Sequence, residues 1–249
     1  MPISAGGELA VVLVEPQHPG NIGMVCRAMA NFGLSDLRLV NPCQYLHPEA
    51  RKFAVAANHL LGQARVFADL SDAIADLHLT VATTRRGGRL RGELLDLAEV
   101  PGLRDKLPPG GRMGLVFGRE DTGLTSDEVG LCSHTATIST AAEVGSINLA
   151  QAVLLFVHEL SRTPRSRAEK NDEPLSEQGE LEALFGQMER VLTKIAFLNP
   201  KCPERVMNPL RQLHQRAGIR CEELQLLRGI WSQIAWSIRA WQGRKRGDG

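Results

Sequence analysis

The sequence predicts an α/β domain with a mostly parallel sheet, followed by a small all-α domain. First, five short apolar runs are mostly continuous rather than alternating, which is typical of strands buried on both faces. Second, helical patterns separate these runs, as in parallel sheets whose strands are joined by crossover helices. Third, after residue 180 apolar side chains recur at three- and four-residue steps, which predicts helices alone.

The elements of the first domain follow in order along residues 1–162. The expected strands cover residues 9–14, 37–40, 79–83, 113–117 and 135–139. The expected helices cover residues 21–32, 48–61, 70–76, 126–132 and 147–160. The last helix completes the α/β domain.

Residues 163–180 have two prolines, eight charged residues and little to bury, a composition typical of a flexible linker. Helices are expected after it near 181–195, 204–216 and 224–241. The last has a 3-4-3-4-3 apolar spacing, the seam of a helix that packs on a partner helix, so Trp231 and Trp241 are interpreted as core residues. The predicted organisation is therefore a domain at 1–162, a linker at 163–180, a helical domain at 181–243 and a basic tail at 244–249.

Composition excludes several classes of protein. The chain has 249 residues, 43% of them hydrophobic and 23% charged, which is typical of a folded globular protein. It has no apolar run of about 18 residues and no signal-peptide pattern at its start, so a cytoplasmic protein without membrane contact is expected. Five cysteines without CxxC spacing favour free thiols, with neither disulfides nor a metal site.

Charge is unevenly distributed. Residues 181–249 carry 12 Lys and Arg against 6 Asp and Glu, whereas residues 1–162 carry 14 against 17. A basic C-terminal region indicates a polyanionic partner, although an ordinary solvated helical surface explains the same charge equally well.

Three glycine-bearing loops follow predicted strands, at 15–27, 115–124 and 138–149. Open α/β sheets bind their ligands outside the carboxyl ends of the strands. No GxxxxGK or GxGxxG pattern is present, so nucleoside triphosphate and ordinary dinucleotide sites are disfavoured. Each loop also has a purely structural explanation: tight turns need glycine, Ser146 is expected to cap the following helix, and Arg27 could be a surface charge.

Taken together, the loops resemble a known family. NIGMVCRA at 21–28, LVFGREDTGLT at 115–125 and SINLA at 146–150 are similar to the three motifs of the SpoU/TrmH family, in the SPOUT class of RNA 2′-O-methyltransferases. FLNPKCPERVMNPLRQLHQRA at 197–217 and ELQLLRGI at 223–230 resemble the tail of its tRNA-methylating TrmJ type. The one departure is Ile147, where leucine is usual.

The resemblance implies a homodimer with the SPOUT α/β-knot fold, in which the chain forms a trefoil knot near the end of the catalytic domain. It implies S-adenosylmethionine as methyl donor, bound in a bent form in the knotted loops. Carried over by motif, the donor contacts fall on Thr83, Thr84, Arg85, Gly118, Ile138, Gly145, Ser146 and Ile147.

The implied chemistry is attack of a ribose 2′-hydroxyl on a sulfonium methyl group, for which alignment supplies much of the rate. The family's motif gives Arg27 a catalytic role. Because a guanidinium is a poor base, we expect it to hold the adjacent phosphate and stabilise the developing alkoxide. Ser146 and Asn148 are expected to orient the ribose and the third loop, and Asn21 and Glu120 to brace the motif loops.

Arg85 begins a run of four arginines within seven residues. Arg86, Arg89 and Arg91 in this run are interpreted as a clamp for RNA phosphates, with a solvated loop as the alternative. The resemblance implies 2′-O-methylation of tRNA as the activity, with the pyrimidine at position 32, which opens the anticodon loop, as the target. The alternatives are another tRNA or rRNA nucleotide, or a catalytically silent RNA-binding module of the same fold.

Overall fold

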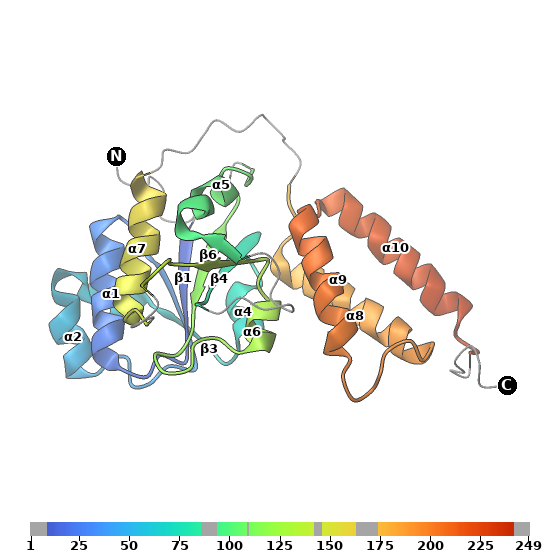
Figure 1. The fold of residues 1–249 in the computed structure, drawn as a ribbon, viewed down its shortest axis with the longest axis horizontal. Coiled ribbons are helices and arrows are strands. Elements are labelled where there is room, and N and C mark those ends of the chain that lie inside the picture. The colour runs from blue at the N-terminus through green and yellow to red at the C-terminus, as the bar shows by residue number, and fades with distance from the viewer. Residues whose placement is uncertain (1–8, 86–93, 109, 142–145, 163–173, 242–249) are drawn as a thin grey trace.

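The computed structural model describes residues 9–85, 94–108, 110–141, 146–162 and 174–241 (Figure 1). Within these residues, seven strands form one sheet in the order β3-β2-β1-β6-β4-β7-β5, and every neighbouring pair is parallel. The predicted mostly parallel α/β sheet is confirmed. The strands are β1 (Leu9–Val14), β2 (Asp36–Val40), β3 (Arg65–Phe67), β4 (Leu79–Thr83), β5 (Leu94–Asp96), β6 (Met113–Phe117) and β7 (His134–Thr137).

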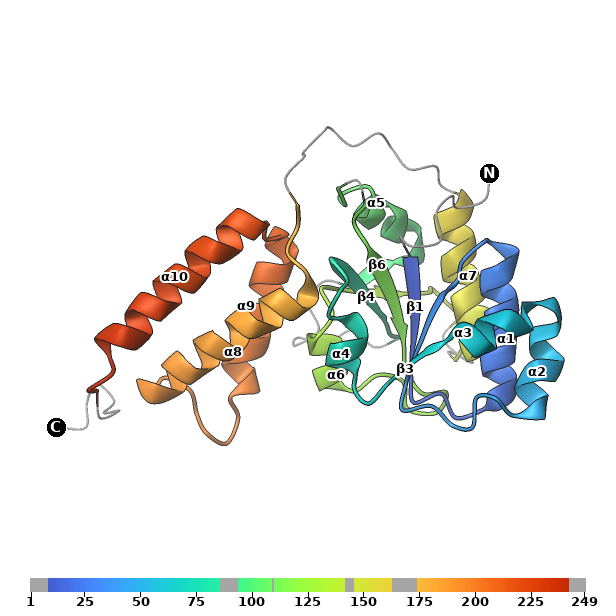
Figure 2. The ribbon, with the colours of Figure 1, turned by 180° about the vertical axis from the view of Figure 1, so that it is seen from behind.

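Helices cover both faces of this sheet (Figures 1 and 2). The larger cluster packs one face beneath α1 (Pro19–Asn31), α2 (Pro48–Ala54), α3 (Asn58–Gln63), α5 (Val100–Arg104) and α7 (Leu149–Arg162). The smaller cluster packs the other face beneath α4 (Leu70–Ile74) and α6 (Ser126–Gly130). Alternate residues of β1 enter the two clusters, Val11 one and Val12 the other, which is why this strand reads as a continuous apolar run.

One strand departs from that pattern. Arg38 lies in the middle of β2, and its side chain is 0% exposed. It donates to Asp36 (Nη2 to Oδ2, 2.8 Å), to the carbonyl oxygen of Ala73 (2.6 Å) and to Asp76. The predicted strand at 37–40 is confirmed as β2, and at Arg38 ion pairs replace apolar packing.

Several predicted boundaries also need correction. The predicted helix at 48–61 is interrupted, because Val55 adopts φ 52° and a 3₁₀ turn, η1 (Val55–Ala57), precedes α3. The sequence reading missed β3 and β5, each three residues long, as well as η2 (Leu97–Glu99) and α5. Strands this short carry too few residues for a recognisable period.

The chain continues with α8 (Gln178–Lys194), α9 (Glu204–Ala217) and α10 (Cys221–Ser237). These helices share an apolar cluster that includes Leu184, Phe185, Met188, Met207 and Leu224. Trp231 packs partly buried against this cluster, whereas Trp241 is 50% exposed, so the interpretation of Trp241 as a core residue is wrong.

The predicted linker at 163–180 is wrong at its C-terminal end. Gln178 and Gly179 already belong to α8, and their backbone N–H groups donate to the carbonyl oxygens of Leu77 (2.8 Å) and Ala75 (2.9 Å). The start of α8 is therefore bonded directly to the α/β part. Residues 163–173 and the basic tail at 244–249 lie outside the described residues. In the part of the chain that the structure describes, no helix is long and apolar enough to cross a membrane.

Candidate active site

A chain of side-chain hydrogen bonds joins the three loops at the carboxyl end of the sheet. Glu120, in the loop after β6, accepts from Asn21 of α1 (Oε1 to Nδ2, 2.9 Å). Asn148, in the loop before α7, donates to the same Asn21 (Nδ2 to Oδ1, 3.0 Å). Asn21 is 7% exposed, so this amide is satisfied by two partners that are distant in sequence.

The Glu120 carboxylate also fixes the start of α1. It accepts from the backbone N–H groups of Gln17 (2.8 Å) and His18 (3.2 Å), immediately before the helix begins at Pro19. A negative charge at a helix N-terminus interacts favourably with the helix dipole. One carboxylate therefore ties the β6 loop to both the side chain and the backbone of the first motif.

Two glycines of the second motif allow its loop to fold on itself. A Cβ on Gly118 would lie 2.2 Å from the carbonyl carbon of Gly123 and 2.4 Å from the nitrogen of Leu124. Gly123 itself has φ +71°, a conformation that L side chains rarely adopt. Gly23 of the first motif serves helix packing instead, because a Cβ there would lie 2.1 Å from the Ala50 carbonyl oxygen of α2.

Arg119, between those two loop glycines, was missed by the sequence reading. Its guanidinium donates to Glu15 after β1 (Nε to Oε2, 2.8 Å), to Glu128 of α6 (3.0 and 2.9 Å) and to the Gly123 carbonyl oxygen (3.2 Å). These bonds hold the pKa of the Glu15 carboxyl below its usual value. At Glu128, burial raises the carboxyl pKa, but the bonds from Arg119 and from the Thr125 backbone outweigh burial and lower it. The signal in the sequence was the TxxE capping pattern at 125–128 directly after the motif.

Arg27 lies six residues after Asn21 on α1, about 9 Å along the helix axis. Its side chain is exposed, whereas Cys26 and Ala28 on either side are buried. The Arg27 guanidinium makes no hydrogen bond or ion pair with any residue that the structure describes. It is therefore free to contact a ligand.

The third loop enters α7 through Asn148. Its Oδ1 accepts from the backbone N–H groups of Ala150 (2.9 Å) and Gln151 (3.4 Å), so Asn148 caps the helix. The expectation that Ser146 is the cap is wrong. Ser146 is exposed and Ile147 half-buried, and Gly145 lies outside the described residues.

The residues expected at the donor site end three neighbouring strands. Thr83 closes β4 and donates to the Val116 carbonyl oxygen of β6 (3.0 Å), while the Thr84 N–H donates to the Ala136 carbonyl oxygen of β7 (3.0 Å). Gly118 follows β6, Ile138 follows β7, and both are half-buried. Arg85 is exposed, and Arg86, Arg89 and Arg91 lie outside the described residues.

Among the described groups, no cluster of three or more His, Cys, Asp or Glu could hold a metal ion.

Two family models match this chain. The SpoU rRNA Methylase family model matches residues 8–158, and the model of the tRNA methyltransferase TrmJ C-terminal domain matches residues 179–246. Together they span the α/β part and the three C-terminal helices.

Full-length relatives agree with the family models. The chain is 36% identical over 236 residues to the tRNA (cytidine/uridine-2′-O-)-methyltransferase TrmJ of Cronobacter sakazakii, covering 91% of this chain and 95% of that protein. It is 36% identical over 253 residues to the tRNA (cytidine/uridine/adenosine-2′-O-)-methyltransferase TrmJ of Pseudomonas aeruginosa, covering 96% and 98%. The crystal structure of TrmJ from Z. mobilis ZM4 superposes with a TM-score of 0.81 at 35% identity, covering 90% of this chain and 98% of that one. This chain therefore belongs to the SpoU methylase family.

Proposed function

We propose that this protein transfers a methyl group from S-adenosylmethionine to a ribose 2′-hydroxyl of tRNA, at the pyrimidine at position 32 of the anticodon loop. The observation that carries the proposal is the hydrogen-bonded chain Glu120–Asn21–Asn148, which joins all three motif loops. Its central member Asn21 lies on α1, the helix that also bears Arg27, whose guanidinium has no partner among the described residues. The similarity to tRNA 2′-O-methyltransferases over nine-tenths of the chain supports tRNA as the substrate.

The donor would lie against the ends of β4, β6 and β7, where it supplies an electrophilic methyl group. The residues there suit such a ligand, because Gly118 has no side chain to occupy the space beside the strand ends and the half-buried Ile138 offers an apolar surface. The proposed donor contacts are Thr83, Thr84, Arg85, Gly118, Ile138, Gly145, Ser146 and Ile147. Most of them would act through backbone or small side-chain groups, so few charged side chains are needed.

The catalytic groups proposed are Arg27, Ser146 and Asn148. Arg27 would hold the phosphate next to the target ribose and stabilise the alkoxide as the 2′-hydroxyl loses its proton. Ser146 would orient the ribose, and Asn148 would fix the third loop through its bond to Asn21. Asn21 and Glu120 would act only as supports, keeping the loops in register.

The wider architecture is part of the same proposal. The loops at 118–125 and 138–148 would form the trefoil knot of a SPOUT domain at 1–162, and two copies would form a homodimer in the cytoplasm. The helical domain at 181–243 would bind tRNA through its excess of basic residues. Arg86, Arg89 and Arg91 would clamp RNA phosphates next to the donor.

One observation favours a broader choice of target base. The Pseudomonas aeruginosa relative is named for adenosine as well as cytidine and uridine, at the same identity as the Cronobacter sakazakii relative. A broader enzyme that accepts adenosine at the target position is therefore the second candidate.

The test is a methyl-transfer assay with labelled donor on unmodified tRNA transcripts carrying C, U or A at position 32, and on a transcript with a 2′-deoxyribose there. We expect methylation of C32 and U32 transcripts and none of the deoxy transcript. Label incorporated into the deoxy transcript would move the target elsewhere, and no incorporation into any tRNA would contradict the proposal.

Arg27→Ala tests the mechanism in the same assay. We expect kcat to fall on the order of a hundredfold or more, with donor affinity nearly unchanged, because the donor contacts come from the other loops. Arg51→Ala, an exposed arginine on the neighbouring helix α2, is the matched control and should keep normal turnover. Near-normal turnover of Arg27→Ala would remove Arg27 from the mechanism.

A further inference from the structure

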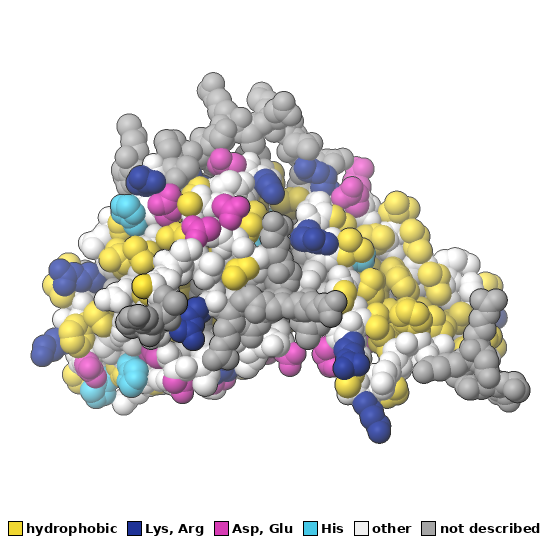
Figure 3. All heavy atoms as spheres, in the orientation of Figure 1, with side chains coloured by type: hydrophobic (Ala, Val, Ile, Leu, Met, Phe, Trp, Pro, Cys, Tyr) yellow, Lys and Arg dark blue, Asp and Glu magenta, His cyan; other side chains and the backbone are white. Residues whose placement is uncertain are grey.

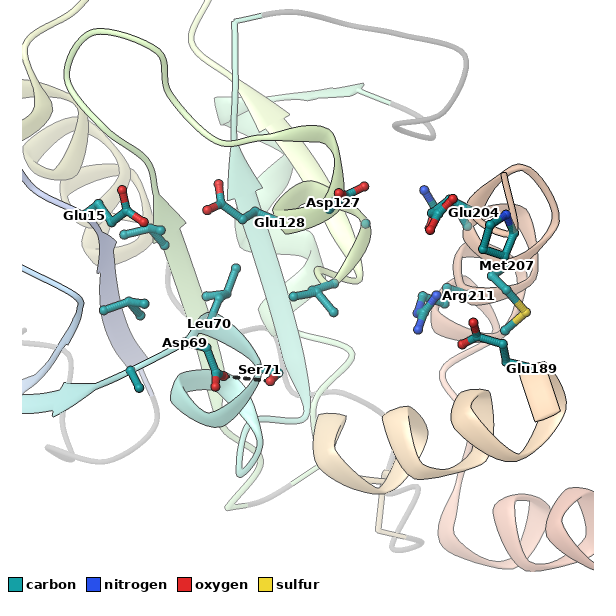
Figure 4. Close-up of a pocket in the computed structure, with 17 residues that line it drawn as sticks. Glu15, Asp69, Leu70, Ser71, Asp127, Glu128, Glu189, Glu204, Met207 and Arg211 are labelled. Atoms are coloured by element: carbon teal, nitrogen blue, oxygen red, sulfur yellow. Dashed lines mark hydrogen bonds between the residues drawn. The ribbon is translucent and has the colours of Figure 1, made fainter. Parts of the chain in front are cut away.

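A cavity of about 450 Å³ lies between the α/β part and the C-terminal helices (Figure 4). Its walls on one side are the ends of β1 and β2, the segment at 68–71 and helix α6, and on the other side α8 and α9. None of Asn21, Glu120 and Asn148 lines it, so it is separate from the hydrogen-bonded chain of the candidate active site.

The cavity is strongly acidic. Its lining carries one guanidinium, Arg211, which pairs with Glu182 (3.1 Å). Against it stand six carboxylates, those of Glu15, Asp69, Asp127, Glu128, Glu189 and Glu204. Figure 4 shows these groups on both sides of the cavity.

Three of these carboxylates have no partner in the part of the chain that the structure describes. Glu15 and Glu128 are bonded to Arg119, and Asp69 caps α4 by accepting from the Asp72 N–H (2.9 Å). The side chains of the remaining three make no hydrogen bond or ion pair with any described residue, and they come from different helices: Asp127, Glu189 and Glu204. Like charges that face each other across a cavity repel, so a cation between them would be stabilised from both sides.

A buried amide provides an independent indication of a ligand. Asn208 of α9 lines the same cavity, is 7% exposed, and its side chain has no hydrogen-bond partner among the described residues. A polar side chain that is more than nine-tenths buried and lines a cavity is normally satisfied by a group inside that cavity, either water or a ligand. Asn208 therefore offers an acceptor oxygen to a bound N–H donor.

The spacing of the carboxylates and the apolar side chains in the lining indicate which kind of cation would fit. In the described part of the chain no three acidic, His or Cys groups converge closely enough to hold a metal ion, so a compact divalent cation has no ligand set here. Apolar side chains lie between the separated carboxylates, among them Val14, Val40, Leu70, Leu131 and Met207. A methylene chain can pack on these while ammonium groups spaced along it reach the carboxylates.

We propose that this cavity binds a linear aliphatic polyamine. Its ammonium groups pair with Asp127 on one side and with Glu189 and Glu204 on the other, one N–H donates to Asn208, and its methylenes cover the apolar floor. Because these partners belong to α6, α8 and α9, the bound polyamine bridges the α/β part and the C-terminal helices and stabilises their contact.

The experiment measures spermidine binding to the full chain by calorimetry and its effect on thermal unfolding, without tRNA or methyl donor, at constant ionic strength. We expect a dissociation constant below about 1 mM and a rise in Tm that equal ionic strength of NaCl or MgCl₂ does not reproduce. An equal Tm rise from MgCl₂, or no measurable heat of spermidine binding, would overturn the proposal. Tighter binding of a Lys/Arg-rich peptide without any spermidine binding would also overturn it, in favour of a peptide site.

Two variants locate the site. The double variant Glu189→Gln/Glu204→Gln should weaken spermidine binding at least tenfold, whereas the matched variant Glu49→Gln/Glu222→Gln, with two exposed carboxylates outside the cavity, should bind normally. Asn208→Leu removes the amide without changing charge and should weaken binding several-fold. Methyl-donor binding by each variant checks that it is folded. Wild-type spermidine affinity in folded Glu189→Gln/Glu204→Gln would overturn the assignment.

Discussion

Two arginine-centred ion clusters lie at opposite ends of the sheet, and they serve different purposes. At the amino end, Arg38 bonds Asp36 and Asp76 with its side chain 0% exposed, and Arg65 and Arg112 join the same carboxylates from nearer the surface. At the carboxyl end, Arg119 bonds Glu15 and Glu128 with its side chain 16% exposed.

The difference lies in what each cluster fixes. The Arg38 cluster joins β2 to the end of α4 beside the smaller apolar cluster, and the Arg38 side chain at its centre is 0% exposed. The Arg119 cluster instead fixes the loop at 118–123 beside the proposed donor site, and water reaches part of it. The same kind of bond therefore supports the core at one end of the sheet and a functional loop at the other. Figure 3 shows that basic and acidic side chains are interspersed over the visible surface of the α/β part. Charged residues are therefore common on this part, and the two clusters differ from each other in the segments that their ion pairs join.

The largest effect is expected at the amino end. Arg38→Ala leaves Asp36 and Asp76 without their buried partner and should lower the free energy of unfolding by about 3–5 kcal/mol. Urea unfolding measures it. Arg65→Ala removes a 46% exposed member of the same cluster and should cost less than about 1 kcal/mol. Equal losses in the two variants would show that burial does not set the importance of these charges.

The second prediction concerns the carboxyl end. Arg119→Met should lower the free energy of unfolding by only about 1–2 kcal/mol, because the cluster is partly exposed, yet weaken methyl-donor binding on the order of tenfold by releasing the 118–123 loop. Arg119→Lys keeps the positive charge but loses the planar guanidinium that bonds Glu15 and Glu128 together. Compared with Arg119→Met, it should recover more of the free energy of unfolding than of the affinity for the methyl donor. Calorimetric donor titration distinguishes the two losses. Unchanged donor affinity in Arg119→Met would assign Arg119 to the fold alone.

The third prediction uses pH to separate the two ends. Burial lowers the pKa of His134, at the amino end of β7, from the usual 6.5 to about 4. Because the unfolded state takes up the proton first, the stability from neutral His134 is fully present above pH 6.5 and lost as pH falls towards 4. Between pH 7 and pH 5 we expect His134 to contribute a loss of roughly 1–2 kcal/mol, which His134→Gln should remove. Burial also lowers the pKa of His78, so a smaller loss from His78 should remain in that variant. In the same window the lowered pKa values of Glu15 and Glu128 keep the Arg119 cluster ionised, so donor affinity should not follow the stability loss.

The smallest effect on stability is expected at Asn148. Asn148→Asp keeps the cap of α7, because a carboxylate accepts the same N–H groups, but it cannot donate to Asn21. The free energy of unfolding should change by less than about 0.5 kcal/mol, whereas methyl transfer should fall on the order of tenfold. Thermal unfolding and the methyl-transfer assay together test this. A variant that loses both equally would reduce Asn148 to a helix cap.

The sequence by itself predicted the parallel α/β sheet and the loops in which the candidate site lies. Continuous apolar runs and glycines directly after strands are local signals for both. The motif positions Asn21, Arg27, Gly118 and Asn148 came instead from the resemblance of the three loops to the SpoU/TrmH motifs. Local signals failed where a strand was too short, as in β3 and β5. They also failed where two nearby residues could both cap a helix: Ser146 was expected to cap α7, but Asn148 does so.

The tertiary structure alone decided which side chains meet. Asn21 contacts residues 99 and 127 positions away, and Arg119 contacts Glu15 across 104 positions. The bonds to Glu120 and Glu15 arise because β1 lies beside β6 in the sheet, and the bond to Asn148 arises because α1 packs against α7. No local periodicity encodes either arrangement. Likewise, Arg38 could be placed in a strand by its apolar neighbours, but only the packing of α4 against β2 brings Asp76 to it and makes a buried charge stable. Periodicity specifies how one segment is buried, whereas the pairing of charges and amides depends on segments that the fold brings together from far apart in the chain.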